Sequence, residues 1–415
     1  MQGKLHIAFH QGNDCTIDLP ASKSECNRAL IINALSEGYC KINNISEADD
    51  TRLLIKALTS NSDVIDVGNA GTAMRFLLSY LSVSGKNITL TGSERMKQRP
   101  IKHLVEALRL LGADIEYLQE NGYPPIKIHG DKSKMKGGDI KIPANISSQF
   151  ISSLLMIAPV LENGMNMVLV GDISSKPYIE MTLSIMKHFG IEYLWEGNKI
   201  SIRNQNYIPA EYNVESDWTN ASYWYSIVAL AKNAAIFLKG LKRNSFQGDA
   251  VISKWFEPFG VVSEFTDKGV FITKGVEDFS KFPRIIDFSA NPDLAQTIIV
   301  LAAATDISCR FTGLESLRIK ETDRIAALQN ELKKFNVHFI EEAKDIYILK
   351  NNFNKNNSPE IATYNDHRMA MSFAPLAVIC KELSIAEPEV VEKSYPRFWD
   401  DLKLAGFEIN EASNK

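Results

Sequence analysis

Two carboxylates in the second half of the sequence stand where a general acid or base could work. Asp293 immediately precedes an apolar run over 294–304 that predicts a buried helix, and Glu321 lies between Lys320 and Arg324. An acid in the first turn of a helix can be a cap that favours the helix dipole, or a base positioned at a cleft. The i,i+3 spacing of Glu321 and Arg324 also fits a structural salt-bridge network on one helix face.

Positively charged residues recur near the starts of expected helices, although the formal net charge of the chain is −4. If these helix starts face one cleft, the site attracts small polyanions. His367, by itself, is more typical of a packed or capping residue than of a catalyst. Because no metal-ligand pattern and no nucleophile-plus-base pattern is present, the residues alone predict group transfer between anionic small molecules. The eight cations are Lys23, Arg28, Arg75, Arg99, Lys320, Arg324, Arg368 and Lys393.

The stretch 68–75 shows how such a site is built. It follows an alternating run over 63–67 and opens an apolar run over 76–81, so it predicts a strand, a tight turn and a helix. Glycines allow close approach of a ligand to the backbone, and the free N–H groups of a helix start favour an anion. The alternative is an ordinary strand-to-helix turn that carries a surface arginine.

Hydroxyl and amide groups mark two further helix starts. Ser147, Ser148 and Gln149 open an apolar run over 150–157, and Ser175 precedes a proline suited to a first helical turn. Simple capping explains some of these serines, while adjacent hydroxyls at a helix start also suit phosphate oxygens.

A repeated unit must position these groups. A helix ends, a Gly or Asn follows, and a strand and hairpin come next, at intervals of 78, 70, 76 and 70 residues. Gly or Asn at that point predicts a left-handed helix cap. With a weaker copy between 23 and 67, the pattern indicates about six α/β units of roughly 70 residues. A domain boundary is expected near 209–217. The five cap positions are Gly112, Gly190, Gly260, Asn336 and Gly406.

Composition limits the function classes. A chain of 415 residues predicts two domains, and a pI near 6.1 argues against a general nucleic-acid binder. The five cysteines have no metal-ligand spacing, and no apolar run reaches the length of about 20 residues that a membrane helix needs. The first residues lack the pattern of a signal peptide. A cytoplasmic protein without metal, membrane or nucleic-acid partner is expected.

Taken together, the ordered motifs resemble the 3-phosphoshikimate 1-carboxyvinyltransferase (5-enolpyruvylshikimate-3-phosphate synthase) family of enolpyruvyl transferases. The resemblance runs nearly from end to end and rests on the stretches 22–24, 68–75, 95–100, 147–149, 175–178, 292–293, 320–324, 365–368 and on Lys393. It implies an α/β (α+β) fold of two domains, each made of three βαβαββ units around a pseudo-threefold axis. The implied domains are 20–216, and 1–19 together with 217–415, with the active site between them.

The resemblance also implies transfer of the enolpyruvyl group of phosphoenolpyruvate to the 5-hydroxyl of 3-phosphoshikimate, in the shikimate pathway, by a monomer without cofactor. Asp293 would accept the hydroxyl proton, Glu321 would protonate the methylene carbon, and Lys23 would touch both substrates. The implied phosphoenolpyruvate residues are Lys23, Asn69, Gly71, Arg99, Gln149, Arg324, Arg368 and Lys393. The implied 3-phosphoshikimate residues are Lys23, Ser24, Arg28, Ser147, Ser148, Gln149, Ser175, Tyr178, Asp293, Ser316 and Lys320.

Some residues depart from the family pattern, and three alternative functions compete with this one. Phe76 stands where the family usually has proline, and Ser316 replaces a common asparagine. The nearest alternative is the UDP-N-acetylglucosamine enolpyruvyl transferase of the same fold, whose usual cysteine is absent from 95–100. A non-catalytic sensor is disfavoured by the presence of both Asp293 and Glu321. An RNA-end-processing relative is disfavoured by the acidic balance.

Overall fold

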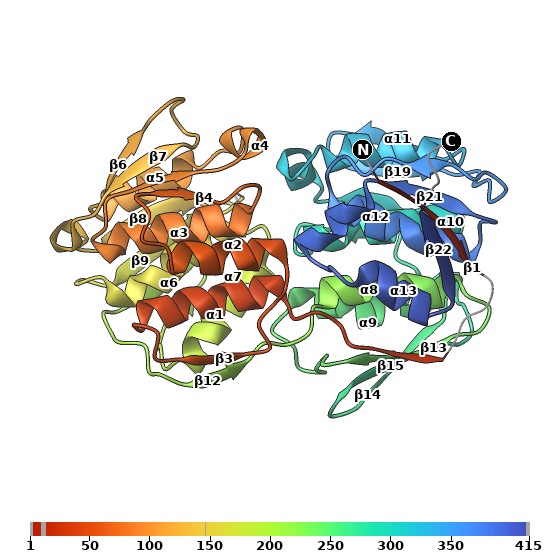
Figure 1. The fold of residues 1–415 in the computed structure, drawn as a ribbon, viewed down its shortest axis with the longest axis horizontal. Helices are drawn as coiled ribbons and strands as arrows, with labels where there is room; N and C mark the ends of the chain where they lie inside the picture. Colours follow the sequence, from red (N-terminus) through yellow and green to blue (C-terminus); the bar gives the residue numbers. More distant parts are fainter. Residues whose placement is uncertain (1–2, 10–13, 146, 412–415) are drawn as a thin grey trace. The chain divides into compact units, whose positions relative to one another are not determined.

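The computed structural model describes residues 3–9, 14–145 and 147–411. The protein is an α/β fold whose chain divides into two compact units, Ala21–Val214 and Met1–Pro20 with Glu215–Lys415. Each unit encloses its own hydrophobic core. Figure 1 labels the helices and strands of both units.

The unit Ala21–Val214 contains two copies of one βαβαββ pattern. In each copy the first strand pairs in parallel with the second, and the closing hairpin adds antiparallel strands beside the second. One copy consists of β4 (Val64–Asp66), α3 (Gly71–Ser84), β5 (Ile88–Thr91), α5 (Lys102–Leu110), β6 (Asp114–Tyr117) and β7 (Ile126–His129). The other consists of β8 (Gly138–Pro143), α6 (Ser148–Ile157), β9 (Met165–Val170), α7 (Lys176–His188), β10 (Leu194–Glu196) and β11 (Lys199–Ile202).

The third copy in this unit is reduced. It keeps two helices, but its described sheet has only two parallel strands, which come from opposite ends of the unit. The chain enters and leaves the unit beside these strands, so the copy is assembled from distant segments. Its elements are α1 (Lys23–Leu35), β3 (Lys41–Asn43), α2 (Asp49–Leu58) and β12 (Glu211–Asn213).

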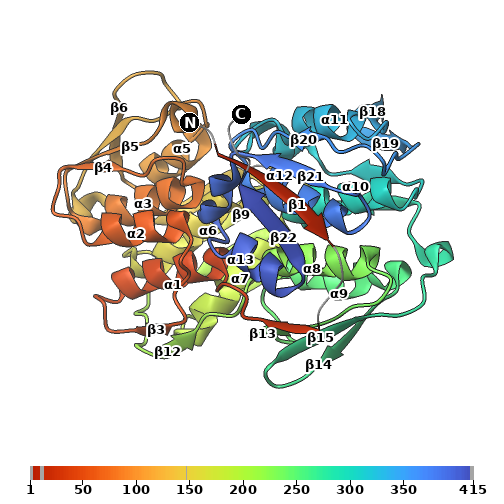
Figure 2. The ribbon, with the colours of Figure 1, turned by 45° about the vertical axis from the view of Figure 1, so that its right-hand side comes forward.

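The other unit contains three four-stranded sheets with the same strand order. The first two strands of the chain belong to it: β2 pairs with β13, and β1 lies between β21 and β22 (Figure 2). The first sheet and its helices comprise β2 (Cys15–Ile17), α8 (Trp218–Leu230), β13 (Ala235–Lys239), α9 (Ile252–Trp255), β14 (Val261–Phe265) and β15 (Gly269–Lys274). The second comprises β16 (Ile285–Asp287), α10 (Ala295–Ala304), β17 (Arg310–Thr312), α11 (Arg324–Lys333), β18 (His338–Ala343) and β19 (Ile346–Lys350). The third comprises β20 (Glu360–Ile361), α12 (His367–Phe373), β21 (Leu383–Ala386), α13 (Phe398–Leu404), β22 (Phe407–Glu411) and β1 (Lys4–Phe9).

The inner helices α8, α10 and α12 carry almost only buried residues. A helix that is apolar on all sides must be surrounded by protein, and these three pack on one another. Hydroxyl groups join the three helices, since that of Thr297 lies 3.2 Å from that of Ser222 and 3.3 Å from that of Ser372. Within the described ranges, no helix combines the length and the apolar character needed to cross a membrane.

The left-handed caps predicted at the repeated Gly or Asn positions are confirmed. All five residues have positive φ, between 61° at Asn336 and 110° at Gly112. The cap reverses the chain so that each helix packs against the strand that follows it. At Gly112 the space is also closed, because an added Cβ would lie 1.8 Å from the carbonyl oxygen of Lys134.

Gly112→Ala is therefore expected to lower the melting temperature clearly more than Gly38→Ala. Gly38 has a φ of 83° but nothing within 4 Å of an added Cβ, so it carries only the backbone cost of about 1–2 kcal/mol. Gly112→Ala adds a clash with the backbone. Calorimetry of both variants measures the difference, and equal losses would show that the space around Gly112 is not closed.

Candidate active site

Asp293 is the centre of a charged cluster in the unit that contains Glu215–Lys415. It lies in the short 3₁₀ helix η6 (Pro292–Leu294), ahead of α10. Its carboxylate is 2.9 Å from Nη2 of Arg368, 3.3 Å from Nη1 of Arg324 and 3.7 Å from Nζ of Lys320. The side chain keeps 19% exposure, so a ligand can reach it.

Arg324 connects this cluster. It is the first residue of α11, its side chain is 1% exposed, and its Nε donates to Oδ2 of Asp366 over 2.7 Å. Nη2 donates to Glu321 over 2.9 Å. Burial opposes the charge of Arg324, but Asp366 and Glu321 outweigh burial and raise its pKa further above the usual value. Asp366 also caps α12 by accepting the N–H of Arg368. One buried carboxylate therefore orients two of the predicted cations.

Glu321 brings Lys393 into the cluster. Nζ of Lys393, the last residue of η9 (Pro388–Lys393), lies 3.0 Å from Oε1 of Glu321. Lys320 and Glu321 both precede α11, and Lys320 has extended backbone. The i,i+3 contact between Glu321 and Arg324 nevertheless forms, since Asp323 caps α11 and turns the chain there.

The charges around Asp293 set its protonation state. Burial favours the neutral acid, but Arg368, Lys320 and Arg324 outweigh it and hold the pKa of Asp293 well below its ordinary value. Burial lowers the pKa of Lys320, although the nearby Asp293 opposes that shift. Asp293 is consequently ionised at neutral pH, which is the state required of a proton acceptor.

Asp249, in η3 (Gly248–Val251), is a further buried carboxyl near Asp293 that the sequence analysis missed. It accepts hydrogen bonds from Thr219 and from Asn291, the latter over 3.0 Å. Burial, and then the charge of Asp293, raise its pKa to about 6. Its sequence neighbours have no pattern that predicts this burial, because its partners lie 30 and 42 residues away, Thr219 in the same repeat and Asn291 in the next one.

In the unit Ala21–Val214, two guanidinium groups flank Gly71. An added Cβ at Gly71 would lie 2.7–2.8 Å from Arg99 and 2.9 Å from Arg75, so only glycine leaves room for both side chains. Arg75 donates to the Gly71 carbonyl over 3.0 Å. Gly71 is the first residue of α3, as the turn over 68–75 predicts.

Other predicted residues lie close to this helix start. Gln149 donates to the hydroxyl of Thr72 over 3.1 Å, which connects the beginnings of α6 and α3. Asn69 is exposed, and its carbonyl accepts a hydrogen bond from the hydroxyl of Ser93. The first turns of α3 and α6, which belong to two different repeats, therefore lie next to each other.

Lys23, Ser24 and Arg28 lie along α1 but differ in environment. Lys23 is the first helical residue and pairs with the buried Asp50 at 3.2 Å, while Ser24 is half-buried. Arg28 is 2% exposed, and burial lowers its pKa to about 10. Its guanidinium donates to Thr182, to Ser152 and to the carbonyls of Ser24 and Tyr178. Arg28 therefore holds α1 against α6 and α7, and its assignment to 3-phosphoshikimate stays a prediction.

The remaining predicted hydroxyls stand at helix starts. Ser147 is the exposed N-cap of α6, and Ser148 is its buried first residue. Ser175 occupies the N-cap of α7 in a left-handed conformation, with φ 53°, and makes no side-chain cap bond. Ser175 therefore stands at the cap position that the sequence predicts, and its hydroxyl makes no cap bond there. Ser316 is exposed in η7 (Glu315–Ile319).

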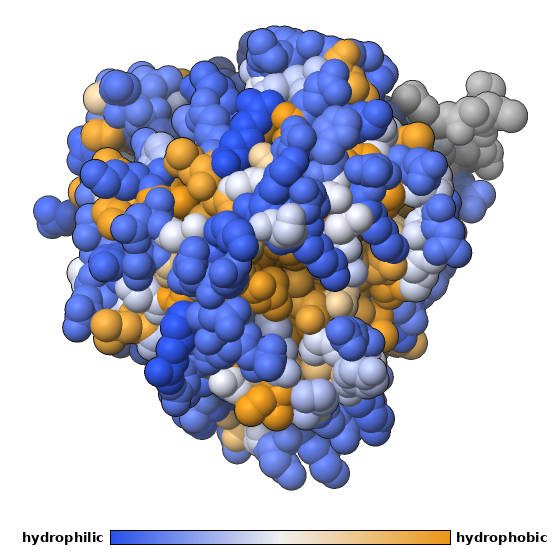
Figure 3. Space-filling model, turned by 90° about the vertical axis from the view of Figure 1, so that its left-hand side faces the viewer, coloured by the Kyte–Doolittle hydropathy of each residue, from blue (hydrophilic) through white to orange (hydrophobic). Residues whose placement is uncertain are grey.

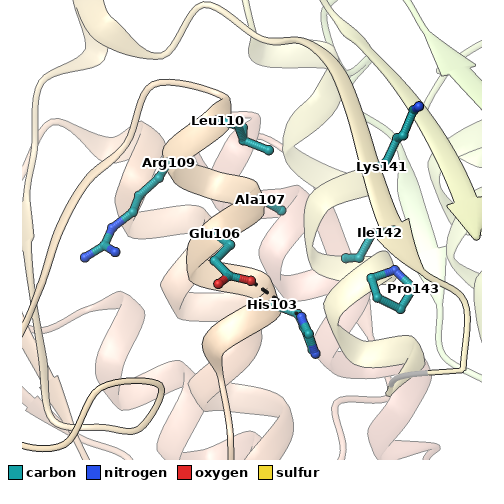
Figure 4. A pocket seen from close by; sticks show the side chains of 8 residues that line it. All are labelled: His103, Glu106, Ala107, Arg109, Leu110, Lys141, Ile142 and Pro143. Atoms are coloured by element: carbon teal, nitrogen blue, oxygen red, sulfur yellow. Dashed lines mark ion pairs between the residues drawn. The ribbon is translucent and has the colours of Figure 1, made fainter.

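Two further observations bear on the search for other sites. A pocket between α5 and β8 is lined by Leu110, Ile142 and a His103–Glu106 pair at 3.5 Å, and Figure 4 shows Arg109 directed away from it. None of the predicted site residues lines this pocket. The face in Figure 3 is mainly hydrophilic, with hydrophobic side chains gathered in a central hollow. Among the described residues no group of His, Cys, Asp or Glu could hold a metal ion.

The structure has two groups of cations, one around Asp293 and one around Gly71, and each lies where several helices begin. Such groups are typical of a protein that binds small anions. A family model described as EPSP synthase (3-phosphoshikimate 1-carboxyvinyltransferase) matches residues 11–60 and 55–402. A 3-phosphoshikimate 1-carboxyvinyltransferase of Bacteroides fragilis is 49% identical over 398 residues, which cover 95% of this chain and 96% of that protein. One from a Sulfurovum strain is 36% identical and covers 93% and 95% of the two chains.

A solved structure of EPSP synthase from Acinetobacter baumannii has the same fold, with a TM-score of 0.76, 21% identity, and coverage of 99% of this chain and 100% of that one. The chain belongs to the EPSP synthase family.

Asp366→Ala is expected to destabilise the protein by about 3–5 kcal/mol, because it leaves the buried guanidinium of Arg324 without its shortest ion pair. Asp400→Ala is the control, since Asp400 is 77% exposed and pairs with Lys403 at the surface. That control should change stability by less than about 1 kcal/mol. Urea unfolding measures both variants, and equal losses would contradict the role of Asp366.

The raised pKa of Asp249 predicts a pH dependence with a defined sign. The folded state keeps the proton up to about pH 6, whereas the unfolded state loses it near its ordinary value, so this group's stabilising contribution is lost as the pH rises through that window. Asp249→Asn removes this loss. The melting temperature of the variant relative to the unmodified protein should therefore be higher at pH 7 than at pH 5. A constant difference between pH 5 and pH 7 would contradict the assignment.

Proposed function

We propose that this protein transfers the enolpyruvyl group of phosphoenolpyruvate to the 5-hydroxyl of 3-phosphoshikimate and releases phosphate, a step of the shikimate pathway. The observation that carries the proposal is the pair Asp293 and Glu321. Both carboxylates contact Arg324, and each also contacts a lysine, Lys320 or Lys393. Two acids among fixed cations suit a reaction that moves protons between two anionic substrates.

In the proposed reaction Asp293 accepts the proton of the 5-hydroxyl as its oxygen bonds to C2 of phosphoenolpyruvate. Glu321, in its protonated form, supplies the proton that C3 gains, so the intermediate is tetrahedral at C2. The bond from C2 to the phosphate oxygen then breaks and phosphate leaves, the carboxylate of Glu321 takes a proton from C3, and the enol ether forms. Arg324, Arg368 and Lys320 stabilise the negative charge throughout.

The residues around Gly71 and along α1, α6 and α7 supply further contacts to the two substrates. We assign phosphoenolpyruvate to the guanidinium of Arg99 beside Gly71, because Arg99 borders the first residue of α3. Arg28 is assigned to 3-phosphoshikimate as a positive charge whose guanidinium is oriented by four protein acceptors. The assigned phosphoenolpyruvate residues are Lys23, Asn69, Gly71, Arg99, Gln149, Arg324, Arg368 and Lys393. The assigned 3-phosphoshikimate residues are Lys23, Ser24, Arg28, Ser147, Ser148, Gln149, Ser175, Tyr178, Asp293, Ser316 and Lys320.

The decisive experiment measures phosphate release from phosphoenolpyruvate with and without 3-phosphoshikimate. Release should require both compounds, and UDP-N-acetylglucosamine should not replace 3-phosphoshikimate. Asp293→Asn should reduce kcat by about 10²–10⁴-fold, since it removes the proton acceptor. Asp287→Asn, an exposed residue of β16, is the matched control and should leave kcat unchanged. Near-normal turnover of Asp293→Asn would exclude Asp293 as the base.

A further inference from the structure

Two successive residues next to the Asp293 cluster have a strained backbone. Tyr364 has a φ of 55° and Asn365 a φ of 56°, in the left-handed region that costs a non-glycine residue about 1 kcal/mol or more. The next residue is Asp366, which holds Arg324 and caps the helix that carries Arg368. A conformation of this kind persists only where surrounding contacts hold it.

The contacts that hold this turn come from α11. The hydroxyl of Tyr364 donates to Oε1 of Glu331 over 2.8 Å, and the N–H of Ala362 donates to Oε2 over 3.0 Å. Glu331 is fully buried, and Nζ of Lys334 lies 2.6 Å from Oε2. The position of this carboxylate is therefore set by three donors. Burial and then Glu331 raise the pKa of Tyr364 to about 12, so its hydroxyl stays a donor.

Helix α11 therefore contacts the turn over 364–366 through two of its side chains. Arg324, its first residue, bonds Asp366, and Glu331, seven residues or about 10 Å further along the helix, bonds Tyr364. Both residues lie on one face of the helix. The other side of the turn is held by Thr363, whose hydroxyl donates to Glu387 over 3.0 Å. The backbone between these anchors has little freedom to relax.

We propose that the hydrogen bond between Tyr364 and Glu331 keeps the turn left-handed and thereby positions Asp366, Arg324 and Arg368 for the anionic substrate. Tyr364 and Glu331 are positioning residues, because they act through Asp366. Without this bond the turn relaxes toward negative φ and Asp366 moves away from Arg324. The activity consequences rest on the proposed function, whereas the conformational consequence does not.

Tyr364→Phe keeps the ring and removes the hydroxyl. Its KM for phosphoenolpyruvate should rise about fivefold to tenfold, because Arg324 and Arg368 lose their orientation, while KM for 3-phosphoshikimate should change less than about twofold. Adding Asn365→Gly should recover much of this loss, since glycine takes the left-handed conformation without steric cost. Tyr225→Phe is the control, because the buried Tyr225 also has one hydroxyl bond, at 2.9 Å to Ser263. It should leave both KM values unchanged.

Crystal structures of the unmodified protein and of Tyr364→Phe test the conformation without any assay. The turn should lose its positive φ at residue 364, or the Arg324–Asp366 contact should lengthen beyond hydrogen-bond distance. A variant with an unchanged turn, or with a lower melting temperature and unchanged KM values, overturns the inference. If the unmodified protein releases no phosphate, the proposed function fails, and the crystal structures still decide the role of Tyr364.

Discussion

The buried charge of Arg324 is the constraint on which the Asp293 cluster depends. A guanidinium that is 1% exposed costs several kcal/mol unless opposite charges surround it, and three carboxylates do so here. They come from three separate segments, so those segments must meet at the start of α11. The side chain of Asp366 is fully buried and makes the shortest ion pair with Arg324. The side chains of Asp293 and Glu321 are partly exposed. The two proposed catalytic acids are therefore held in place by a residue that is itself almost fully buried.

This arrangement couples ligand binding to acid–base chemistry. In the structure the cations Lys320, Arg368 and Lys393 are engaged by Asp293 and Glu321, so an anionic ligand must compete with those carboxylates. A cation that turns toward a phosphate or carboxylate of the ligand no longer depresses the pKa of Asp293. The base would then gain strength only when substrate is present. Such coupling fits the proposed reaction, because the same cations stabilise the developing charge.

The sequence could predict the parts of the site that depend on local rules. The glycine turn before Arg75, the left-handed caps and the repeated α/β unit follow from turn chemistry and periodicity, and all are present. It could predict the local pair of Glu321 with Arg324, but not the charge pairs between distant segments. The contacts of Arg28 with α6 and α7, and the pairing of Arg324 with Asp366, join segments that are far apart in the sequence. Asp249 was missed because its hydrogen bonds come from residues 30 and 42 positions away in the sequence. Local pattern sets where helices begin, and tertiary packing decides what each start contacts.

The repeat explains why groups distant in the sequence meet at all. Equivalent helices of successive βαβαββ repeats pack side by side, so their first turns lie together. Asp293, ahead of α10, therefore reaches Arg368 in α12. In the other unit the same relation joins Thr72 of α3 to Gln149 of α6. The bodies of these helices are apolar and must remain so to pack, whereas residues of the first turn lie at the end of the packed bundle. Charged side chains can therefore accumulate there without disturbing the core, and free N–H groups add to their attraction for anions. A fold built by repetition gathers helix starts first, and the chemistry then depends on which side chains occupy them.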